Sequence, residues 1–146
     1  MKNQLFRIAK SEKEVIKNDM YNRGYFVVEI DSVILKNYKI FMETMSEKFK
    51  FPHVVTNFNS LNDYMTDLDW LDNKVGYTMF INKFHEISCV SYDESIRIAE
   101  SNFCGMMRWL YYWEEEITKV TGYWDEESRA FSGGLSPKRF NIYLVD

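Results

Sequence analysis

The sequence has few of the residues that mark several classes of protein. Its 146 residues include two prolines and two cysteines, Cys89 and Cys104. Two cysteines cannot build a disulfide framework, so we expect buried thiols in a reducing compartment. No window approaches the roughly 18 apolar residues of a membrane span, and no apolar signal-peptide stretch follows the first residues. We therefore expect a cytoplasmic protein with no membrane partner.

Positive charge is also scarce. The 18 lysines and arginines are outnumbered by 22 aspartates and glutamates, which gives a formal net charge of −4. Binding along a phosphate backbone needs a surplus of cations, so this balance argues against a nucleic-acid partner and favours a basic protein. A content of 46% hydrophobic and 17% aromatic residues is typical of one compact globular domain.

Enzyme and cofactor motifs are absent. The sequence has no glycine-rich phosphate loop, no Gly-x-Ser-x-Gly elbow and no His-Glu-x-x-His motif. His85 and Cys89 have helical i, i+4 spacing, but two ligands do not complete a zinc site. We therefore expect no metal, no cofactor and no enzymatic activity. The alternative is an enzyme that uses the carboxylates of Asp63 and Asp67, or Cys104 together with a histidine.

Three short runs of β-branched and aromatic residues predict strands over 25–30, 76–81 and 139–145. Helical patterns separate these runs. Strands that alternate with helices favour a parallel sheet with right-handed crossovers, so the predicted class is α/β.

Residues 1–24 differ from the rest of the chain because they are basic and carry their own helix signals. Ser11 begins a Ser-x-x-Glu capping box, and Gly24 is suited to the turn that ends a helix. We expect an N-terminal extension over 1–24 and one domain over 25–146. Asn37 is expected to cap the first helix of that domain.

A long amphipathic helix is predicted over residues 91–121. A second capping box begins at Ser91, Gly105 is placed to kink or divide the helix, and Gly122 is placed to end it. Its apolar stripe would suit a dimer seam, but only about three heptads repeat, so packing across the sheet is favoured.

The most informative segment is a helix predicted over residues 60–70. Its apolar stripe at i, i+3, i+4 and i+7 spacing consists of Leu61, Tyr64, Met65 and Leu68. Its opposite face carries Asn59, Asp63, Thr66 and Trp70, flanked by Asn62, Asp67 and Asp69.

The outward face of this helix is acidic. Residues 51–73 contain no lysine or arginine, although another acidic stretch follows at 114–116 and 125–127. Carboxylates around an exposed aromatic ring are suited to a basic protein partner. The alternative for Trp70 is that it lies beyond the helix end and packs inward.

The order of residues in this region resembles the barstar family of intracellular ribonuclease inhibitors. The similar segment begins with Phe51-Pro52 and continues through residues 57–71. The positions that agree with the family pattern are Asn57, Leu61, Asp63, Asp67, Leu68, Trp70 and Leu71. The predicted strands also fit, so the resemblance extends over about residues 24–146.

The resemblance implies a small three-stranded parallel sheet flanked by helices, and inhibition by occlusion. In this family an acidic helix and the loop before it enter the basic active-site cleft of a ribonuclease, where carboxylates replace substrate phosphates. Asp63 matches the principal inhibitory acid. Asn59 stands where the family often has aspartate, and Asn62 where the founding member has an aromatic residue. Residues 53–56 are one residue shorter than the family loop and lack its tyrosine and glycine, which implies a different toxin.

These observations lead to one expected function and one alternative. We expect a bacterial immunity protein or antitoxin that binds and occludes the active site of a ribonuclease toxin. The expected partner-binding residues are Asp63, Asn59, Asn62, Thr66, Asp67 and Trp70. The alternative is a binding module of the same fold that neutralises a toxin of another type or binds a regulatory partner.

Overall fold

The computed structural model describes residues 2–88 and 92–146 and contains a four-stranded parallel sheet in the order β1–β6–β3–β2. Its strands are β1 (Leu5–Ile8), β2 (Phe26–Asp31), β3 (Gly76–Asn82) and β6 (Arg139–Val145). The three strands predicted from the sequence are therefore confirmed to within a residue at most ends.

The sheet has one strand more than the three that were expected, because residues 1–24 contribute β1. This strand pairs in parallel with β6, from Leu5 opposite Ile142 to Ile8 opposite Val145. The ring of Phe6 stacks on Tyr143 with ring centroids 4.8 Å apart. A run of four residues gives almost no periodic signal, and the β6 edge that it pairs with lies more than 130 residues away. The independence of residues 25–146 stays a prediction.

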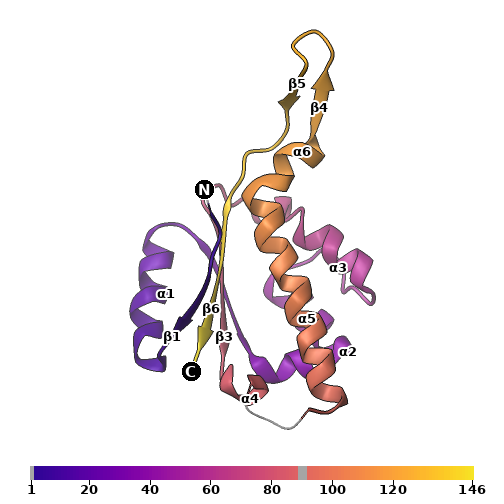
Figure 1. Cartoon of the computed structure of the whole chain (residues 1–146). Helices are drawn as coiled ribbons and strands as arrows, with labels where there is room; N and C mark the ends of the chain where they lie inside the picture. Colours follow the sequence, from indigo (N-terminus) through magenta and orange to yellow (C-terminus); the bar gives the residue numbers. More distant parts are fainter. Residues whose placement is uncertain (1, 89–91) are drawn as a thin grey trace.

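Helices cover both faces of the sheet (Figure 1). Helix α1 (Lys13–Asn22) lies on one face. Three helices lie on the other: α2 (Tyr38–Lys48), α3 (Phe58–Met65) and α5 (Glu94–Tyr111). The chain crosses from β1 to β2 along one face and returns through β3 to β6 along the other, as right-handed crossovers require. In the described part of the chain, none of the helices is long and apolar enough to cross a bilayer.

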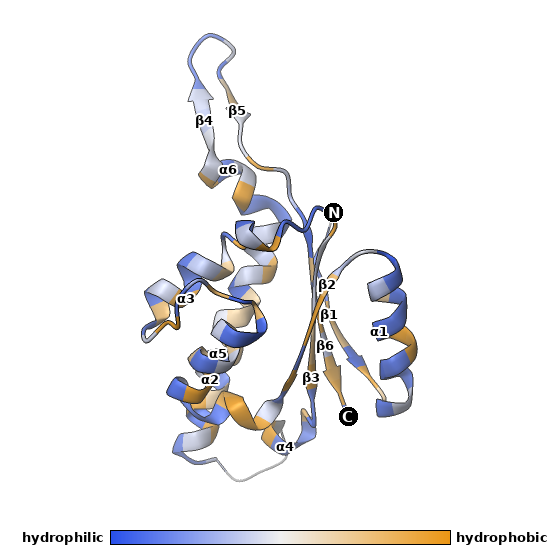
Figure 2. Cartoon of the chain, turned by 180° about the vertical axis from the view of Figure 1, so that it is seen from behind, coloured by the Kyte–Doolittle hydropathy of each residue, from blue (hydrophilic) through white to orange (hydrophobic). Residues whose placement is uncertain are grey.

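The core is divided by the sheet into two unequal parts. The larger part lies under α2, α3 and α5, and its largest fully buried side chains include Trp109, Trp113, Tyr77, Phe41 and Phe49. The smaller part lies on the α1 side and is formed by Phe80, Tyr143 and Val145. Because both faces are covered, β3 is almost entirely buried. Figure 2 shows that α1, by contrast, is mostly hydrophilic.

Two predicted helix ends are confirmed. The Asn37 side chain accepts a hydrogen bond from the Ile40 N–H at 3.0 Å and so caps α2. Gly24 follows α1 with a φ of +82°, the left-handed conformation that glycine adopts without a steric penalty.

The predicted capping box at Ser11 is not used. Ser11 lies inside a 3₁₀ turn (Lys10–Glu12), and the Glu12 carboxylate accepts from the Ala9 N–H at 2.9 Å instead. Helix α5 begins later than expected, with Asp93 as its cap. Ser91 lies outside the described residues.

The long predicted helix contains an irregular turn. Helix α5 continues through Gly105 without a break, contrary to the expectation of a division there. A π-helical turn (Tyr112–Glu116) then joins it to α6 (Ile117–Thr121), which ends at Gly122 as predicted. We call residues 112–116 the π-turn.

An antiparallel hairpin follows α6 and was not predicted from the sequence. Its strands are β4 (Gly122–Asp125) and β5 (Ala130–Gly133). Figures 1 and 2 show that this hairpin extends away from the sheet and the helices packed on it. A short helix, α4 (His85–Ser88), follows β3.

Candidate functional site

Helix α3 is held by its apolar side and presents polar residues outward. The Asn57 side chain caps the helix by accepting from the Ser60 N–H at 2.9 Å. Leu61 and Met65 are fully buried in the core. On the opposite side, Asn59 and Asp63 are exposed. Because residues four apart lie on one helix face, both side chains point toward the same region of solvent.

The helix is shorter than predicted. It ends at Met65, and Leu68 then adopts a left-handed conformation with a φ of +52° before a 3₁₀ turn (Asp69–Leu71). Leu68 is nevertheless fully buried. The apolar spacing therefore identified the buried residues correctly, but the backbone changes direction to bury the last of them.

Trp70 consequently does not lie on the outward face of α3. Its indole N–H donates a hydrogen bond to the Phe49 carbonyl at 2.9 Å. The ring packs edge-on against Phe51 and Tyr64, with centroid distances of 5.6 and 5.3 Å. Trp70 is half-buried and packs inward, as the alternative prediction for this residue stated. It holds the segment after α3 against the end of α2.

Two other predicted site residues have internal partners. The Asn62 side-chain oxygen accepts a hydrogen bond from the Trp109 indole at 2.9 Å. The Thr66 hydroxyl donates to the Asn62 carbonyl at 2.7 Å. Both side chains are half-buried. Asn62 joins α3 to α5, and Thr66 closes the last turn of α3.

The acidic side chains of this region face solvent. Asp63, Asp67, Asp69 and Asp72 are exposed. Within residues 2–88 and 92–146, none of them forms a salt bridge, although eleven salt bridges occur elsewhere. Their charges are available to a positively charged partner. We call the surface formed by Asn59, Asp63 and Asp67 the acidic face.

An open cavity of about 370 Å³ lies beside the acidic face, between α3 and α5. Asn59 and Asn62 line it from α3, and Cys104, Gly105 and Arg108 are among the residues that line it from α5. Cys104 is exposed, so the expectation of a buried thiol is wrong for this residue. Cys89 lies outside the described residues.

Arg108 is a site residue that the sequence analysis missed. It is exposed on the wall of this cavity and places one positive charge beside the acidic face. Only the packing of α5 on α3 brings it there, across more than 40 residues of chain, so no local pattern identifies it.

The loop before α3 adds a second exposed surface. Val55 is buried, and its N–H donates to the Ser46 hydroxyl at 3.2 Å. Val54 is 65% exposed, and His53 and Thr56 are also exposed. The single buried anchor fixes the loop, and the remaining side chains lie next to α3.

The negative potential of the acidic face reaches nearby tyrosines. Burial raises the pKa of Tyr77 to about 12, with added contributions from Asp69 and Asp67. Burial, Asp67 and Glu116 also raise the pKa of Tyr112, in that order of importance. Because Tyr112 and Glu116 belong to the π-turn, the acidic face is electrostatically connected to it.

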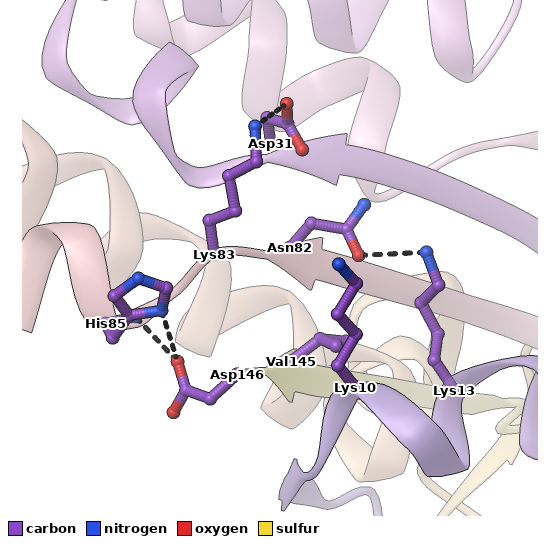
Figure 3. Close-up of a pocket in the computed structure, with 8 residues that line it drawn as sticks. All are labelled: Lys10, Lys13, Asp31, Asn82, Lys83, His85, Val145 and Asp146. Atoms are coloured by element: carbon purple, nitrogen blue, oxygen red, sulfur yellow. Dashed lines mark hydrogen bonds and ion pairs between the residues drawn. The ribbon is translucent and has the colours of Figure 1, made fainter.

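Another cavity, of about 260 Å³, lies at the carboxyl end of the parallel sheet (Figure 3). Small ligands often bind at this edge in α/β proteins. Here most of the charged groups already have a partner: Lys83 pairs with Asp31 and His85 with Asp146 inside the cavity, and Lys13 pairs with Glu29 outside its lining. The described residues contain no group of three or more potential metal ligands. The acidic face is therefore the better candidate for binding a partner.

Comparison with known families supports the same region. A family model described as Barstar (barnase inhibitor) matches residues 25–103, more than half of the chain. The chain belongs to the barstar family. Searches among curated proteins and among solved structures found no match. Barstar family members are inhibitors that bind ribonucleases of the barnase type, and the matched region contains the whole of α3 and the loop before it. Arg108, the π-turn and the β4–β5 hairpin lie beyond the match.

Proposed function

We propose that this barstar-family protein is an immunity protein or antitoxin that inhibits a ribonuclease toxin in the cytoplasm of a bacterium. The observation that carries this proposal is the acidic face, because its exposed carboxylates form no salt bridge with any residue that the structure describes. Ribonuclease active sites bind phosphates with cations. A rigid helix that presents carboxylates at such a cleft can replace the substrate and block it.

The proposed roles follow from what each side chain already contacts. Asp63 occupies a phosphate position in the toxin, and Asn59 and Asp67 bind on either side of it. Asn62 supports binding by fixing α3 against α5, and Thr66 supports it by a hydrogen bond within the last turn of α3. Trp70 holds the segment after α3 through its hydrogen bond to Phe49.

The test begins with capture on immobilised full-length chain from lysate and medium of the cells that produce it. Captured proteins are purified and assayed for cleavage of a fluorescent RNA substrate. The proposal expects a ribonuclease whose activity falls to zero at one equivalent of the chain. Asp63→Ala is expected to lose this inhibition, whereas Asp19→Ala, on the opposite face of the sheet, keeps it. Failure to recover any ribonuclease, or recovery of one that the chain does not inhibit, would overturn the proposal.

A second candidate function is neutralisation of another kind of toxin, or binding of a regulatory partner. It is favoured by Asn59 and Asn62, which stand where family members have acidic or aromatic residues, and by Arg108, which adds a positive charge beside the acidic face. The same capture experiment distinguishes the two functions. A captured partner without ribonuclease activity that still requires Asp63 for binding would favour the second.

A further inference from the structure

The β4–β5 hairpin exposes three large aromatic side chains. Tyr123 is 63% exposed, Phe131 is 55% exposed and Trp124 is 49% exposed. The core tryptophans Trp109 and Trp113 are each 1% exposed. Large aromatic rings that are left in solvent close together are typical of a binding surface.

The aromatic rings occupy both sides of the hairpin. Trp124 pairs across the strands with Phe131, and their rings meet edge-to-face at a centroid distance of 5.8 Å. Tyr123 is the next residue along β4, so its side chain points to the other side, where its cross-strand neighbour is Ser132. Leu135, just after β5, is 60% exposed.

This arrangement is costly for an isolated protein. A two-stranded hairpin is marginally stable alone in water, and this one pairs with no third strand in the described part of the chain. The rings also remain about half exposed or more. The hairpin itself extends away from the sheet and the helices packed on it (Figure 1). Contact with another molecule would remove both costs.

The helical segment that leads to the hairpin is anchored at the end of α3. The Trp113 indole in the π-turn donates a hydrogen bond to the Met65 carbonyl at the end of α3, at 2.9 Å. The hairpin begins nine residues after Trp113, about 13 Å further along a helix axis. A standard interface covers about 800 Å² on each partner, which is roughly 30 Å across. One partner can therefore contact the acidic face and the hairpin together.

The charge of the hairpin has the same sign as that of the acidic face. Its turn contains Asp125, Glu126 and Glu127, against one cation, Arg129. Hydrogen bonds from the Ser128 hydroxyl and the Glu127 N–H hold the Asp125 carboxylate in place at 2.7 and 3.1 Å. Like charge disfavours a second copy of this chain or an anionic membrane, and it favours a basic protein.

We propose that the β4–β5 hairpin is a second docking surface for the basic ribonuclease that the acidic face binds, with Trp124 and Phe131 as its anchors. This inference rests on the proposed function. The carboxylates of the acidic face block the catalytic cleft, while the hairpin reaches a neighbouring apolar patch of the same enzyme. Because the hairpin lies outside the family match, it provides selectivity for one toxin among those with similar clefts.

The test compares four forms of the full-length chain: wild type, Asp63→Ala, the double variant Trp124→Ser/Phe131→Ser, and Tyr21→Ser. Tyr21 is a matched control, because it is a 55% exposed aromatic residue on α1, on the opposite face of the sheet. The probe is the purified ribonuclease recovered on immobilised wild-type chain, and the readout is its dissociation constant. Thermal unfolding checks that each variant folds.

The proposal expects the hairpin variant to weaken binding by about 30-fold or more, which is the loss typical of an interface hot spot. Tyr21→Ser should bind as wild type does. If Asp63→Ala loses binding and the hairpin variant does not, this inference is overturned and the proposed function stands. If only the hairpin variant loses binding, Asp63 is not part of the interface. That result overturns the proposed function, and it also overturns the shared interface proposed here. Failure to recover a ribonuclease overturns both.

A second readout locates the contact directly. The chain has four tryptophans, so labelling with 5-fluorotryptophan gives four ¹⁹F resonances, and Trp124→Phe assigns one of them. Addition of the ribonuclease should shift the Trp124 resonance and protect it from a soluble paramagnetic quencher. An unshifted resonance in the saturated complex would overturn the proposal. Two further results would also overturn it. One is dimerisation of the free wild-type chain that the hairpin variant loses, and the other is binding of wild type to anionic phosphatidylserine vesicles that the hairpin variant loses.

Discussion

The indole N–H of Trp109 donates a hydrogen bond to the side-chain oxygen of Asn62 at 2.9 Å, and this contact joins α5 to α3. Trp109 is almost fully buried, whereas Asn62 reaches the surface. The orientation of the acidic face therefore depends on a core residue that is 47 positions away in the sequence.

Asn62→Ala tests this support. The substitution leaves the Trp109 indole N–H buried without an acceptor, so we expect the free energy of unfolding to fall by about 1–2 kcal/mol. Chemical denaturation with urea measures the change. Asn59→Ala is the control, because Asn59 is exposed on the same helix and its side chain forms no hydrogen bond with another described residue. An equal loss in both variants would contradict the role of the Trp109 contact.

Asp63→Ala tests the acidic face. We expect partner binding to weaken by about 2–5 kcal/mol, a range known for desolvated charge pairs, those of the founding barstar complex included. The free energy of unfolding should change by less than about 0.5 kcal/mol, because Asp63 is exposed and forms no salt bridge within residues 2–88 and 92–146. Calorimetric titration with the purified partner gives the first quantity and urea denaturation the second. A binding loss below about 0.5 kcal/mol would remove Asp63 from the interface.

Phe6→Ala tests whether β1 is part of the folded domain. Phe6 stacks on Tyr143 and packs in the core on the α1 side of the sheet, so we expect a loss of about 1–3 kcal/mol in stability. Leu5→Ala is the control on the same strand, since Leu5 is 41% exposed and should cost much less. Unchanged unfolding of the Phe6 variant would show that residues 1–24 are a detachable extension.

Glu29 gives a testable pH dependence. Although burial raises its pKa, hydrogen bonds from Lys13, Asn82 and Lys17 lower it to about 2, below the ordinary value of 4.5. A carboxylate with a lowered pKa in the folded state stabilises the protein fully above about pH 4.5 and loses this effect as the pH falls toward 2. Solvent screening limits the contribution to about 1 kcal/mol.

Glu29→Gln should therefore reduce stability at pH 7 by about this amount, and its difference from wild type should shrink between pH 4.5 and 2. Urea denaturation across this range provides the measurement. Glu47→Gln should follow the wild-type profile, because Glu47 is an exposed carboxylate on α2 that forms no salt bridge in the described part of the chain. A difference between Glu29→Gln and wild type that stays constant with pH would exclude this role of Glu29.

Local patterns were enough to predict most of the sheet and part of the candidate site. The strands over 76–81 and 139–145 were recognisable because a strand buried on both faces is a continuous apolar run. The spacing of Leu61, Met65 and Leu68 identified the buried side of α3. The predicted helix continued to residue 70, since spacing does not reveal that Leu68 reaches the core through a left-handed turn.

By itself, the sequence determined the α/β class, the barstar-family resemblance and the outward position of Asp63, because each depends on residues close together in the chain. Only the tertiary structure decided the fourth strand, the inward packing of Trp70, the place of Arg108 and the exposed aromatic hairpin. The first three features depend on contacts between segments that are distant in sequence, and the exposed hairpin depends on the lack of such contacts. These contacts are fixed only when the core packs.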